Sequence, residues 1–336
     1  FTNINPTVGG WGRDAFTIEN FRDVLTNANV HRAMANSFIA SVGGALLAVA
    51  IGLFFAWVVA RTDTPLKGNP VAVVLDGGGI DAGAMQRFTD WTNLSEATFV
   101  SAPTNAQADY ALRIFCPGRE LPFAGHPTLG SCHAWLAAGG QPKGEVIVQE
   151  CGVGLVRIRR DGARLAFAAP PLRRSGPLAE SDVALIARGL RVAREDIVAH
   201  AWCDNGPNWR GVMLRSAEQV LALVPDAGVL AGLDIGVVGP RGKVGVVAAQ
   251  PAASDTQFEV RAFFPGHGGM AEDPVTGSLN AALAQWLIGA GIAPPSYVAA
   301  QGTAMGRAGR VFVQRDGANI WIGGSSVTVI EGSVAL

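Results

Sequence analysis

Charged side chains are scarce in this chain, and neither sign is in excess. Of the 336 residues, 26 are Lys or Arg and 27 are Asp or Glu, and charged residues make up 16% of the total. No net field is therefore available to attract a polyanion or an anionic membrane surface. The sequence excludes nucleic acid as an expected partner.

Cysteine is scarce as well, and its spacing fits neither a disulfide framework nor a metal site. The four cysteines, which contain no C-x-x-C pair, are Cys116, Cys132, Cys151 and Cys203. We therefore expect reduced thiols in a cytoplasmic enzyme domain. No ligand cluster has the spacing of a zinc site, and no G-x-G-x-x-G opens a helix after a strand. The sequence predicts no metal ion, flavin or nicotinamide, and hence no cofactor.

Long apolar runs are missing except for one near the start of the chain. Residues 38–60 read FIASVGGALLAVAIGLFFAWVVA, and Ser41 is their only polar side chain. A run of this length can cross a bilayer as a helix, whereas a signal peptide would begin closer to the terminus and end in a cleavage site. The run predicts a transmembrane helix that contacts the membrane and tethers the enzyme domain to the inner membrane. A buried helix, or the first strand of the following domain, stays open as the alternative.

The sequence around this apolar run resembles a fragment of a transporter. FTIENFRDVL, AMANSF and AWVVARTDTP are similar to the entry into a membrane helix of an ABC transporter permease, and this resemblance covers residues 1–63 only. One spanning helix cannot enclose a translocation path, so transport is not indicated. The segment is interpreted as a fusion, natural or made in assembly, or as a recruited strand.

The remainder of the chain contains an internal repeat. RIFCPG, which starts at Arg113, aligns with RAFFPG, which starts at Arg261. The match resumes with a one-residue slip, so that AGHP in the first copy pairs with AEDP in the second. We interpret this repeat as a duplication. In this alignment His126 and Asp273 are equivalent, which would place them on opposite walls of one cleft.

Both copies have the same order of expected elements. The first has the strand VAVVLD, the helix AMQRFTDWTN and the strands ATFV and DYALRIF, and the second has GVMLRS, AEQVLALV, GVVG, KVGVVAAQ and QFEVRAFF. Alternating apolar residues mark the strands. The apolar segments SCHAWLAAG and SLNAALAQWLIGAG then predict one buried helix in each copy. We expect the active site where these two helices begin.

These patterns predict an α+β fold of two pseudo-symmetric lobes, each a curved, mostly antiparallel sheet around a central helix. The expected first lobe is 64–172 and the second is 173–310. Residues 311–336 are expected to form closing strands that return to the first lobe. Residues 1–63 form the permease-like segment.

Glu96 is the first candidate for chemistry, in the stretch TNLSEATFV. By itself, a salt-bridged or helix-ending glutamate is the simpler interpretation. Asn93 and Ser95 supply donors beside it, and apolar surroundings would raise its carboxyl pKa toward the range useful for acid–base work. We therefore predict that Glu96 is catalytic and that Asn93 and Ser95 bind substrate.

The two helix starts complete the candidate site. GHPTLG and EDPVTGS each present free N–H groups that can bind an anion. His126 as a structural histidine and Asp273 as an ordinary cap are the simpler interpretations, but the repeat brings both beside Glu96. We predict that His126 and Asp273 are catalytic together with Glu96. The remaining predicted substrate-binding residues are Gly125, Thr276, Gly277 and Ser278.

Four stretches in this order and spacing resemble the PhzF-like phenazine-biosynthesis family: GNPVAVVLD, TNLSEATFV, ELPFAGHPTLGSCHAW and EDPVTGSLNAAL. The resemblance runs from about residue 64 to the C-terminus. It implies the fold of diaminopimelate epimerase and the cofactor-independent isomerisation of trans-2,3-dihydro-3-hydroxyanthranilate. It also implies that Glu96 moves a proton between ring carbons, while His126, Asp273 and Ser278 hold the substrate. Family members open with a strand like VDVFTDTP, whereas this chain has VARTD at 59–63.

The expected function is a cofactor-independent isomerase that moves a proton on a small carboxylated substrate. The alternative is a membrane-anchored ligand-binding or transport-related fusion protein without catalysis. Glu96 beside His126 and Asp273 favours the isomerase, because binding alone requires no poised base. Epimerases of this fold use one cysteine at each helix start. This chain has no such pair of cysteines, which argues against racemisation by thiols. Pairing of two chains into a homodimer stays open.

Overall fold

The structure is a computed structural model that describes residues 22, 25–42, 68–242, 255–266 and 269–335. The chain divides into two units, Phe1–Thr64 and Pro65–Leu336, and each is described by itself.

In the first unit, residues 28–42 are helical and mostly exposed. None of the helices among the described residues combines the length and the apolar character that crossing a bilayer requires. Most of the predicted transmembrane run, residues 43–60, lies outside the described residues. That prediction, together with the alternative of a recruited first strand, therefore stays a prediction.

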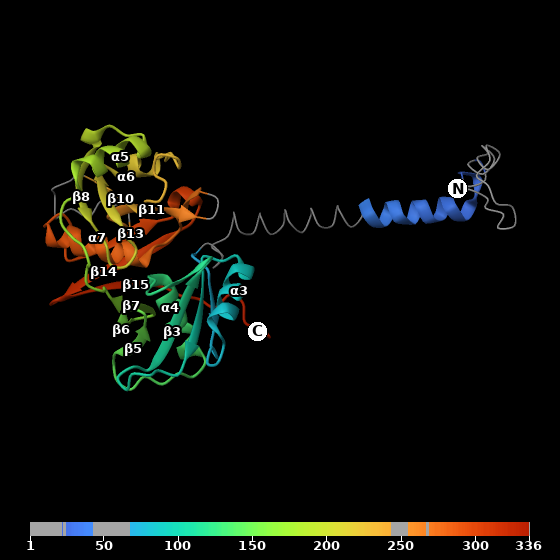
Figure 1. Ribbon diagram of the computed structural model, residues 1–336, viewed down its shortest axis with the longest axis horizontal. Helices are drawn as coiled ribbons and strands as arrows, with labels where there is room; N and C mark the ends of the chain where they lie inside the picture. Colours follow the sequence, from blue (N-terminus) through green and yellow to red (C-terminus); the bar gives the residue numbers. More distant parts are fainter. Residues whose placement is uncertain (1–21, 23–24, 43–67, 243–254, 267–268, 336) are drawn as a thin grey trace. The chain divides into compact units, whose positions relative to one another are not determined.

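The second unit confirms the predicted α+β class (Figure 1). What we call its N-terminal half consists of β1 (Val71–Val74), α3 (Ala82–Thr92), β2 (Glu96–Ser101), β3 (Tyr110–Cys116), β4 (Arg119–Leu121), α4 (Gly125–Ala137), β5 (Ile147–Cys151), β6 (Gly154–Asp161) and β7 (Arg164–Ala168). Its C-terminal half consists of α5 (Glu180–Leu190), β8 (Ile197–Trp202), β9 (Arg210–Leu214), α6 (Ala217–Leu221), β10 (Ile235–Pro240), β11 (Phe258–Gly266), β12 (Gly269–Asp273), α7 (Gly277–Gly289) and β13 (Ser296–Gln301). Two closing strands follow, β14 (Gly309–Asp316) and β15 (Asn319–Gly324). The predicted strand KVGVVAAQ falls on 243–250, outside the described residues.

One continuous sheet connects the two halves. Among the described residues its strand order is β1-β2-β3-β5-β6-β7-β15-β14-β13-β11-β10-β9-β8, with β4 added to β3 and β12 added to β11. Most neighbours are antiparallel, and the parallel pairs among the described strands are β1 with β2, β3 with β5, β9 with β10 and β11 with β13. The closing strands form the junction, because β15 pairs with β7 while β14 pairs with β13.

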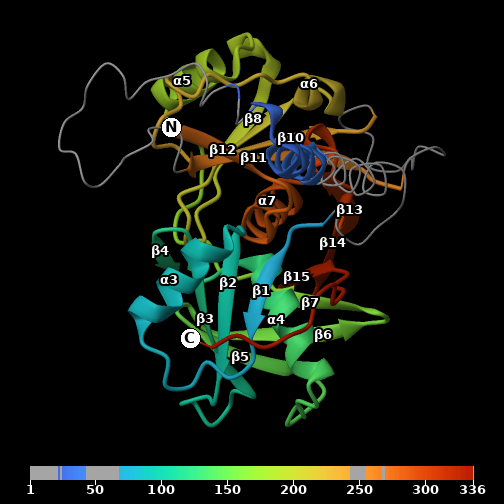
Figure 2. The ribbon, with the colours of Figure 1, turned by 90° about the vertical axis from the view of Figure 1, so that its right-hand side faces the viewer.

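The two long apolar helices fill the two halves of this sheet (Figure 2). α4 packs against β1, β2 and β7, α7 packs against β14 and β15, and the two helices contact each other. Ten of the 13 residues of α7 are buried, which is why its sequence is apolar on every face. α4 buries mainly its first half, so that both helices are most enclosed where they begin.

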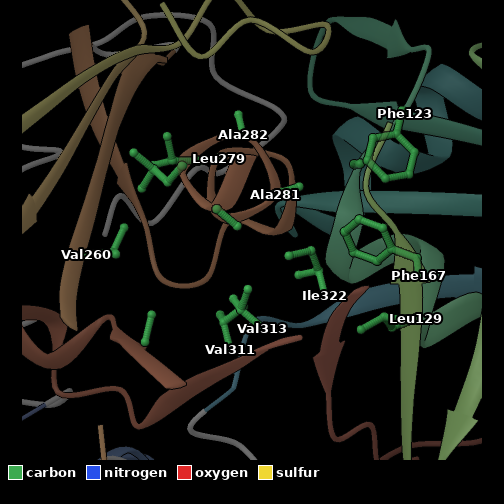
Figure 3. Packing of buried hydrophobic residues seen from close by; sticks show 14 of the residues in the cluster. Phe123, Leu129, Phe167, Val260, Leu279, Ala281, Ala282, Val311, Val313 and Ile322 are labelled. Carbon is green, nitrogen blue, oxygen red and sulfur yellow. The ribbon is translucent and has the colours of Figure 1, made fainter. Parts of the chain in front are cut away.

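A single apolar cluster spans the junction between the halves (Figure 3). Phe123, Leu129 and Phe167 come from the N-terminal half, and Leu279 comes from α7. Val311, Val313 and Ile322 of the closing strands lie between them. Each fully buried side chain of this size contributes roughly 1.5–3 kcal/mol through removal of apolar surface from water. The shared core therefore fixes the halves, and with them the two helix starts, in one arrangement.

The halves repeat one arrangement of elements. The series β1-α3-β2-β3-β4-α4 has the same strand directions as β9-α6-β10-β11-β12-α7, and α4 and α7 have the same length of 13 residues. The strand register shows how the copies align. Phe115 of β3 pairs with Glu120, and the equivalent Phe263 of β11 pairs with Glu272. The second hairpin is therefore four residues longer than the first.

This register corrects the alignment predicted from the sequence. Each helix begins five residues after the paired glutamate, so ELPFAG aligns with EDPVTG. His126 then corresponds to Ser278, and Asp273 corresponds to Leu121. The predicted equivalence of His126 and Asp273 is wrong, because the longer hairpin of the second copy shifts the motif relative to the preceding strand.

Candidate active site

The two buried helices begin in direct contact. A Cβ atom added to Gly125 would lie 2.5 Å from the Cα atom of Gly277, and one added to Gly277 would lie 2.6 Å from the Cα atom of Gly125. Glycine is therefore required at both positions, because any side chain would push the helix starts apart. Within the described part of the chain, neither helix has a side-chain N-cap. The first-turn N–H groups of both helices are thus left to bind an anion.

The carboxylate of Glu96, at the start of β2, contacts His126 in the first turn of α4. Glu96 Oε2 and His126 Nε2 are 3.1 Å apart, and the two side chains are 14% and 15% exposed. The alignment is that of an ion pair rather than a hydrogen bond, and neither atom has a hydrogen-bond partner among the residues described. Buried polar atoms in this state carry a desolvation cost unless a ligand satisfies them.

The charge on His126 depends on two carboxylates. Burial lowers its pKa, but the negative charges of Glu96 and Asp273, the contact with Glu96 and the backbone of Pro70 together raise it by more. The pKa of His126 is therefore above its ordinary value. The ring presents an N–H to the Glu96 carboxylate in either the charged form or the tautomer that carries its proton on Nε2.

Asp273 ends β12 and is hydrogen-bonded on both oxygens. Thr276 Oγ1 donates to Oδ2 at 2.6 Å, and Asn69 Nδ2 donates to Oδ1 at 2.9 Å. Burial and the charge of Glu96 raise the pKa of Asp273 to about 6, and they outweigh the opposing effects of His126 and the two hydrogen bonds. A carboxyl group with this pKa gains and loses protons near neutral pH, as acid–base chemistry requires.

A buried amide network fixes the segment between Asp273 and α7. Gln301 Nε2 donates to the backbone carbonyl of Asp273 at 3.0 Å and to Thr276 Oγ1 at 2.8 Å. Gln301 Oε1 accepts from the Thr276 backbone N–H at 3.0 Å and from Asn280 Nδ2 at 2.8 Å. Gln301 is fully buried, so these contacts are made without competition from water. These hydrogen bonds hold Thr276 in place, and Thr276 in turn donates to the Asp273 carboxyl group.

Ser278 lies on the opposite helix start from His126, and two residues of the loop after β8 contact it. Trp209 Nε1 donates to Ser278 Oγ at 3.2 Å, and Asn205 Nδ2 donates to the Ser278 carbonyl at 2.8 Å. Because the Ser278 oxygen accepts from Trp209, its own O–H is available to donate to another group. The Asn205 side-chain oxygen is buried without a hydrogen-bond partner among the residues described.

The structure thus brings together most of the predicted site residues. Glu96, His126 and Asp273 gather at the helix starts, with Gly125, Thr276, Gly277 and Ser278 around them. Asn93 and Ser95 are different. Asn93 is exposed and ends α3 in a left-handed conformation (φ 53°), and within the described part of the chain neither side chain makes a hydrogen bond. Their predicted role as donors next to Glu96 has no contact to support it.

Four polar residues around the site were missed by sequence reasoning: Asn69, Asn205, Trp209 and Gln301. The signal available was composition, since Asn69 stands in GNP, and Asn205 and Trp209 in DNGPNW. Polar side chains in such Gly- and Pro-rich loops often have functional roles. No comparable signal marks Gln301, which lies at the end of β13.

Metal binding finds no geometric support in the described part of the chain. No group of three His, Cys, Asp or Glu residues there is arranged to hold a metal ion. The acidic and imidazole groups at the helix starts are engaged with each other and with amides.

Comparison with known proteins gives consistent results. The profile of a family described as phenazine biosynthesis-like protein (PhzC-PhzF) matches residues 58–332. Antisense-enhancing sequence 1 of Schizosaccharomyces pombe is 36% identical over an alignment that covers 79% of this chain and 93% of that protein. Trans-2,3-dihydro-3-hydroxyanthranilate isomerase of Pseudomonas fluorescens is 30% identical over 82% of this chain and 97% of that enzyme.

Solved structures share the fold. A Bacillus anthracis phenazine biosynthesis protein of the PhzF family has a TM-score of 0.65 at 21% identity and is aligned over 82% of this chain and 96% of its own. An Enterococcus faecalis protein of the same family has a TM-score of 0.60 at 24% identity, over 79% of this chain and 92% of its own. The family match begins at residue 58, so residues 1–57 lie outside it.

Proposed function

Since the chain belongs to the family of phenazine biosynthesis-like proteins and is an isomerase, we propose that it moves a proton on a small carboxylated substrate and that Glu96 is the base. The observation that carries this proposal is the position of Glu96 Oε2. It lies 3.1 Å from His126 Nε2, at the point where two helices begin, and has no hydrogen-bond partner among the residues described. A base that is held in place but not saturated can accept a proton from a bound ligand.

The substrate carboxylate binds in this proposal at the paired helix starts. The uncapped N–H groups of α4 and α7 and the positive ends of the two helix dipoles favour an anion there. The free O–H of Ser278 adds one donor. A carboxylate held in this way places the neighbouring carbons beside Glu96.

The proposed step is a proton shift within one molecule. Ionised Glu96 removes a proton from a carbon next to a double bond, the electron pair moves along the conjugated system, and Glu96 returns the proton to another carbon. Every atom and electron is retained, so the step requires no oxidant or reductant. His126 holds the Glu96 carboxylate, and Asp273 with its pKa of about 6 can hold or release a proton beside the substrate.

The substrate of the P. fluorescens relative is the natural first choice for a test. Its name describes a ring with a carboxylate, an amino group and a hydroxyl group. We propose small cyclic carboxylates of this kind as the substrate class, with amino-acid carboxylates as the next group to be screened.

The test measures deuterium uptake from heavy water into these compounds. Glu96→Gln should reduce exchange by about a hundred- to ten-thousand-fold, the usual contribution of a general base, because the amide keeps the shape but cannot ionise. Substrate affinity should change little, since the helix starts are untouched. Glu145→Gln, which alters an exposed glutamate of a loop, is the matched control and should exchange at the normal rate.

Two outcomes would count against this assignment. Normal exchange by Glu96→Gln, together with loss of exchange in Asp273→Asn, would move the base to Asp273. Binding of these carboxylates by the unaltered chain with no deuterium uptake by any of them would favour a ligand-binding protein instead.

A further inference from the structure

Asn69, two residues before β1, is hydrogen-bonded to groups from both halves of the unit. Its Nδ2 atom donates to the Val275 carbonyl at 3.0 Å and to Asp273 Oδ1 at 2.9 Å in the C-terminal half. The same atom lies 3.2 Å from Nδ1 of His126 in the N-terminal half. One amide therefore links His126 to Asp273.

The orientation of this amide follows from its partners. A backbone carbonyl can only accept, so the Asn69 atom that faces Val275 must be the NH₂ group. A rotated amide would instead place its oxygen against the Val275 carbonyl and the Asp273 carboxylate, which are both acceptors. The Asn69 oxygen points elsewhere, and among the described residues it has no hydrogen-bond partner.

This orientation decides which nitrogen of His126 carries the proton. The two hydrogens of this NH₂ group are directed at Val275 and Asp273, and His126 Nδ1 shares one of them at 3.2 Å. Because an NH₂ group cannot accept a hydrogen bond, a lone pair on Nδ1 of His126 is favoured over an N–H at this contact. The proton of a neutral ring is then on Nε2, which lies 3.1 Å from Glu96 Oε2. We propose that Asn69 is a positioning residue that holds His126 in its Nε2–H tautomer, so that the imidazole presents an N–H rather than a lone pair to the Glu96 carboxylate.

Asn69 also opposes protonation of the ring. The charged groups that face His126 are Glu96 from β2 and Asp273 from β12, and both favour the imidazolium form, as does the backbone carbonyl of Pro70. An imidazolium would point an N–H from Nδ1 at the NH₂ group of Asn69, which places two donors against each other. The amide thus keeps one lone pair on the ring while the carboxylates remain close.

The consequence for the reaction rests on the proposed role of Glu96. A donor at Nε2 holds the Glu96 carboxylate in place, whereas a lone pair at Nε2 would repel it. In the wrong tautomer Glu96 would rotate away from His126 and lose its fixed orientation. The expected defect is in the rate of proton transfer rather than in substrate binding.

Imidazole ¹⁵N NMR of the full chain tests the tautomer directly, with His126→Gln used to assign the signals. The unaltered chain should show a protonated Nε2 and an unprotonated Nδ1 on His126. Asn69→Asp, which offers only acceptors, should move the proton to Nδ1 or place protons on both nitrogens. Asn69→Ala removes the constraint without adding a charge and should give a mixture. Asn319→Asp adds the same charge on β15, beside Arg157, and should leave the His126 signals unchanged.

Kinetics provides the second readout. Asn69→Asp and Asn69→Ala should lower kcat by about ten- to a hundred-fold, less than loss of the base itself, with KM changed by less than about threefold. An Nδ1–H ring in the unaltered chain, or an unchanged tautomer in both Asn69 variants, would overturn the proposal. The NMR result does not depend on activity. Full exchange by Glu96→Gln with the expected tautomer would therefore refute the role of Glu96 and leave that of Asn69 intact.

Discussion

At the scale of single residues, the site concentrates three groups that are each costly to bury. Glu96 contacts His126, and Asn69 connects His126 to Asp273. The hydrogen bonds from Asn69 and Thr276 to Asp273 offset part of the cost of burying its carboxyl group. Burial and the charge of Glu96 raise the pKa of Asp273, so ionising Asp273 in this site has a cost. The stability of the unit should therefore depend on pH through this site.

Asp273 sets the direction of that dependence. Its pKa rises from the ordinary value of 3.8 to about 6 in the folded protein, so the folded state retains the proton to higher pH. The associated stability is complete below about pH 4 and is lost as the pH rises through 6. Between pH 5 and 7, the free energy of unfolding of the unaltered protein should fall by about 1 kcal/mol more than that of Asp273→Asn. Urea titrations at both pH values measure this difference, and parallel changes in the two proteins would refute it.

The sequence indicated the acidic and basic members of the site but not the residues that orient them. Glu96, His126 and Asp273 stand in motifs whose residue types carry acid–base chemistry, and the buried helices made their meeting point predictable. Asn69 is 57 residues from His126 and 204 from Asp273 in the chain. Its role arises only when the two halves close around it, and no local pattern encodes that contact.

At the scale of elements, the two copies of the repeat use the same pair of residues in different surroundings. Arg113 of β3 forms a two-fold hydrogen-bonded ion pair with Glu120 of β4, and Arg261 of β11 forms the same pair with Glu272 of β12. The side chains of Arg113 and Glu120 are 39% and 42% exposed, whereas those of Arg261 and Glu272 are 8% and 15% exposed. Arg261 also donates to two backbone carbonyls at the end of α6.

These differences predict unequal effects for one substitution made at equivalent positions. Arg261→Met leaves a largely buried carboxylate without its donor and removes the Arg261 hydrogen bonds to the Val220 and Leu223 carbonyls, so it should destabilise the fold by about 3–5 kcal/mol. Arg113→Met removes an exposed pair and should cost about 0–1 kcal/mol. Urea denaturation of both variants measures the difference. Equal losses would mean that burial of the second pair has no energetic effect.

The order of elements was predictable, whereas their alignment was not. Alternating apolar residues in DYALRIF and QFEVRAFF marked β3 and β11, and the apolar runs marked α4 and α7. The predicted equivalence of His126 with Asp273 is wrong because the sequence alignment paired AGHP with AEDP. In both stretches a Pro follows a polar residue, and this identity scored better than the alignment that the strand register shows. The second hairpin has four extra residues because the paired ends of β11 and β12 are longer than those of β3 and β4, and this changes the alignment without leaving a mark in the hydrophobic pattern.

At the scale of the whole unit from Pro65 onward, the closing strands decide how far the two halves are independent. β15 pairs with β7 and β14 pairs with β13, so the sheet has no break between the halves. Val311, Val313 and Ile322 of these strands belong to the same apolar cluster as residues of α4 and α7. Unfolding of one half would expose the apolar surface of the other.

We therefore expect the unit to unfold in one transition, although chains of this size often unfold in steps. Tryptophan fluorescence and far-UV circular dichroism should give the same urea midpoint for the full chain. Arg261→Met offers a sharper measurement, because its lesion lies wholly in the C-terminal half. If the core is shared, hydrogen exchange should show that the amides of β2 and β3 in the N-terminal half lose protection together with those of β10 and β11. Protection that stays at its normal level in β2 and β3 while β10 and β11 exchange would show two independent halves. The helix starts would then meet only when both halves are folded, and the site would be less stable than the halves that carry it.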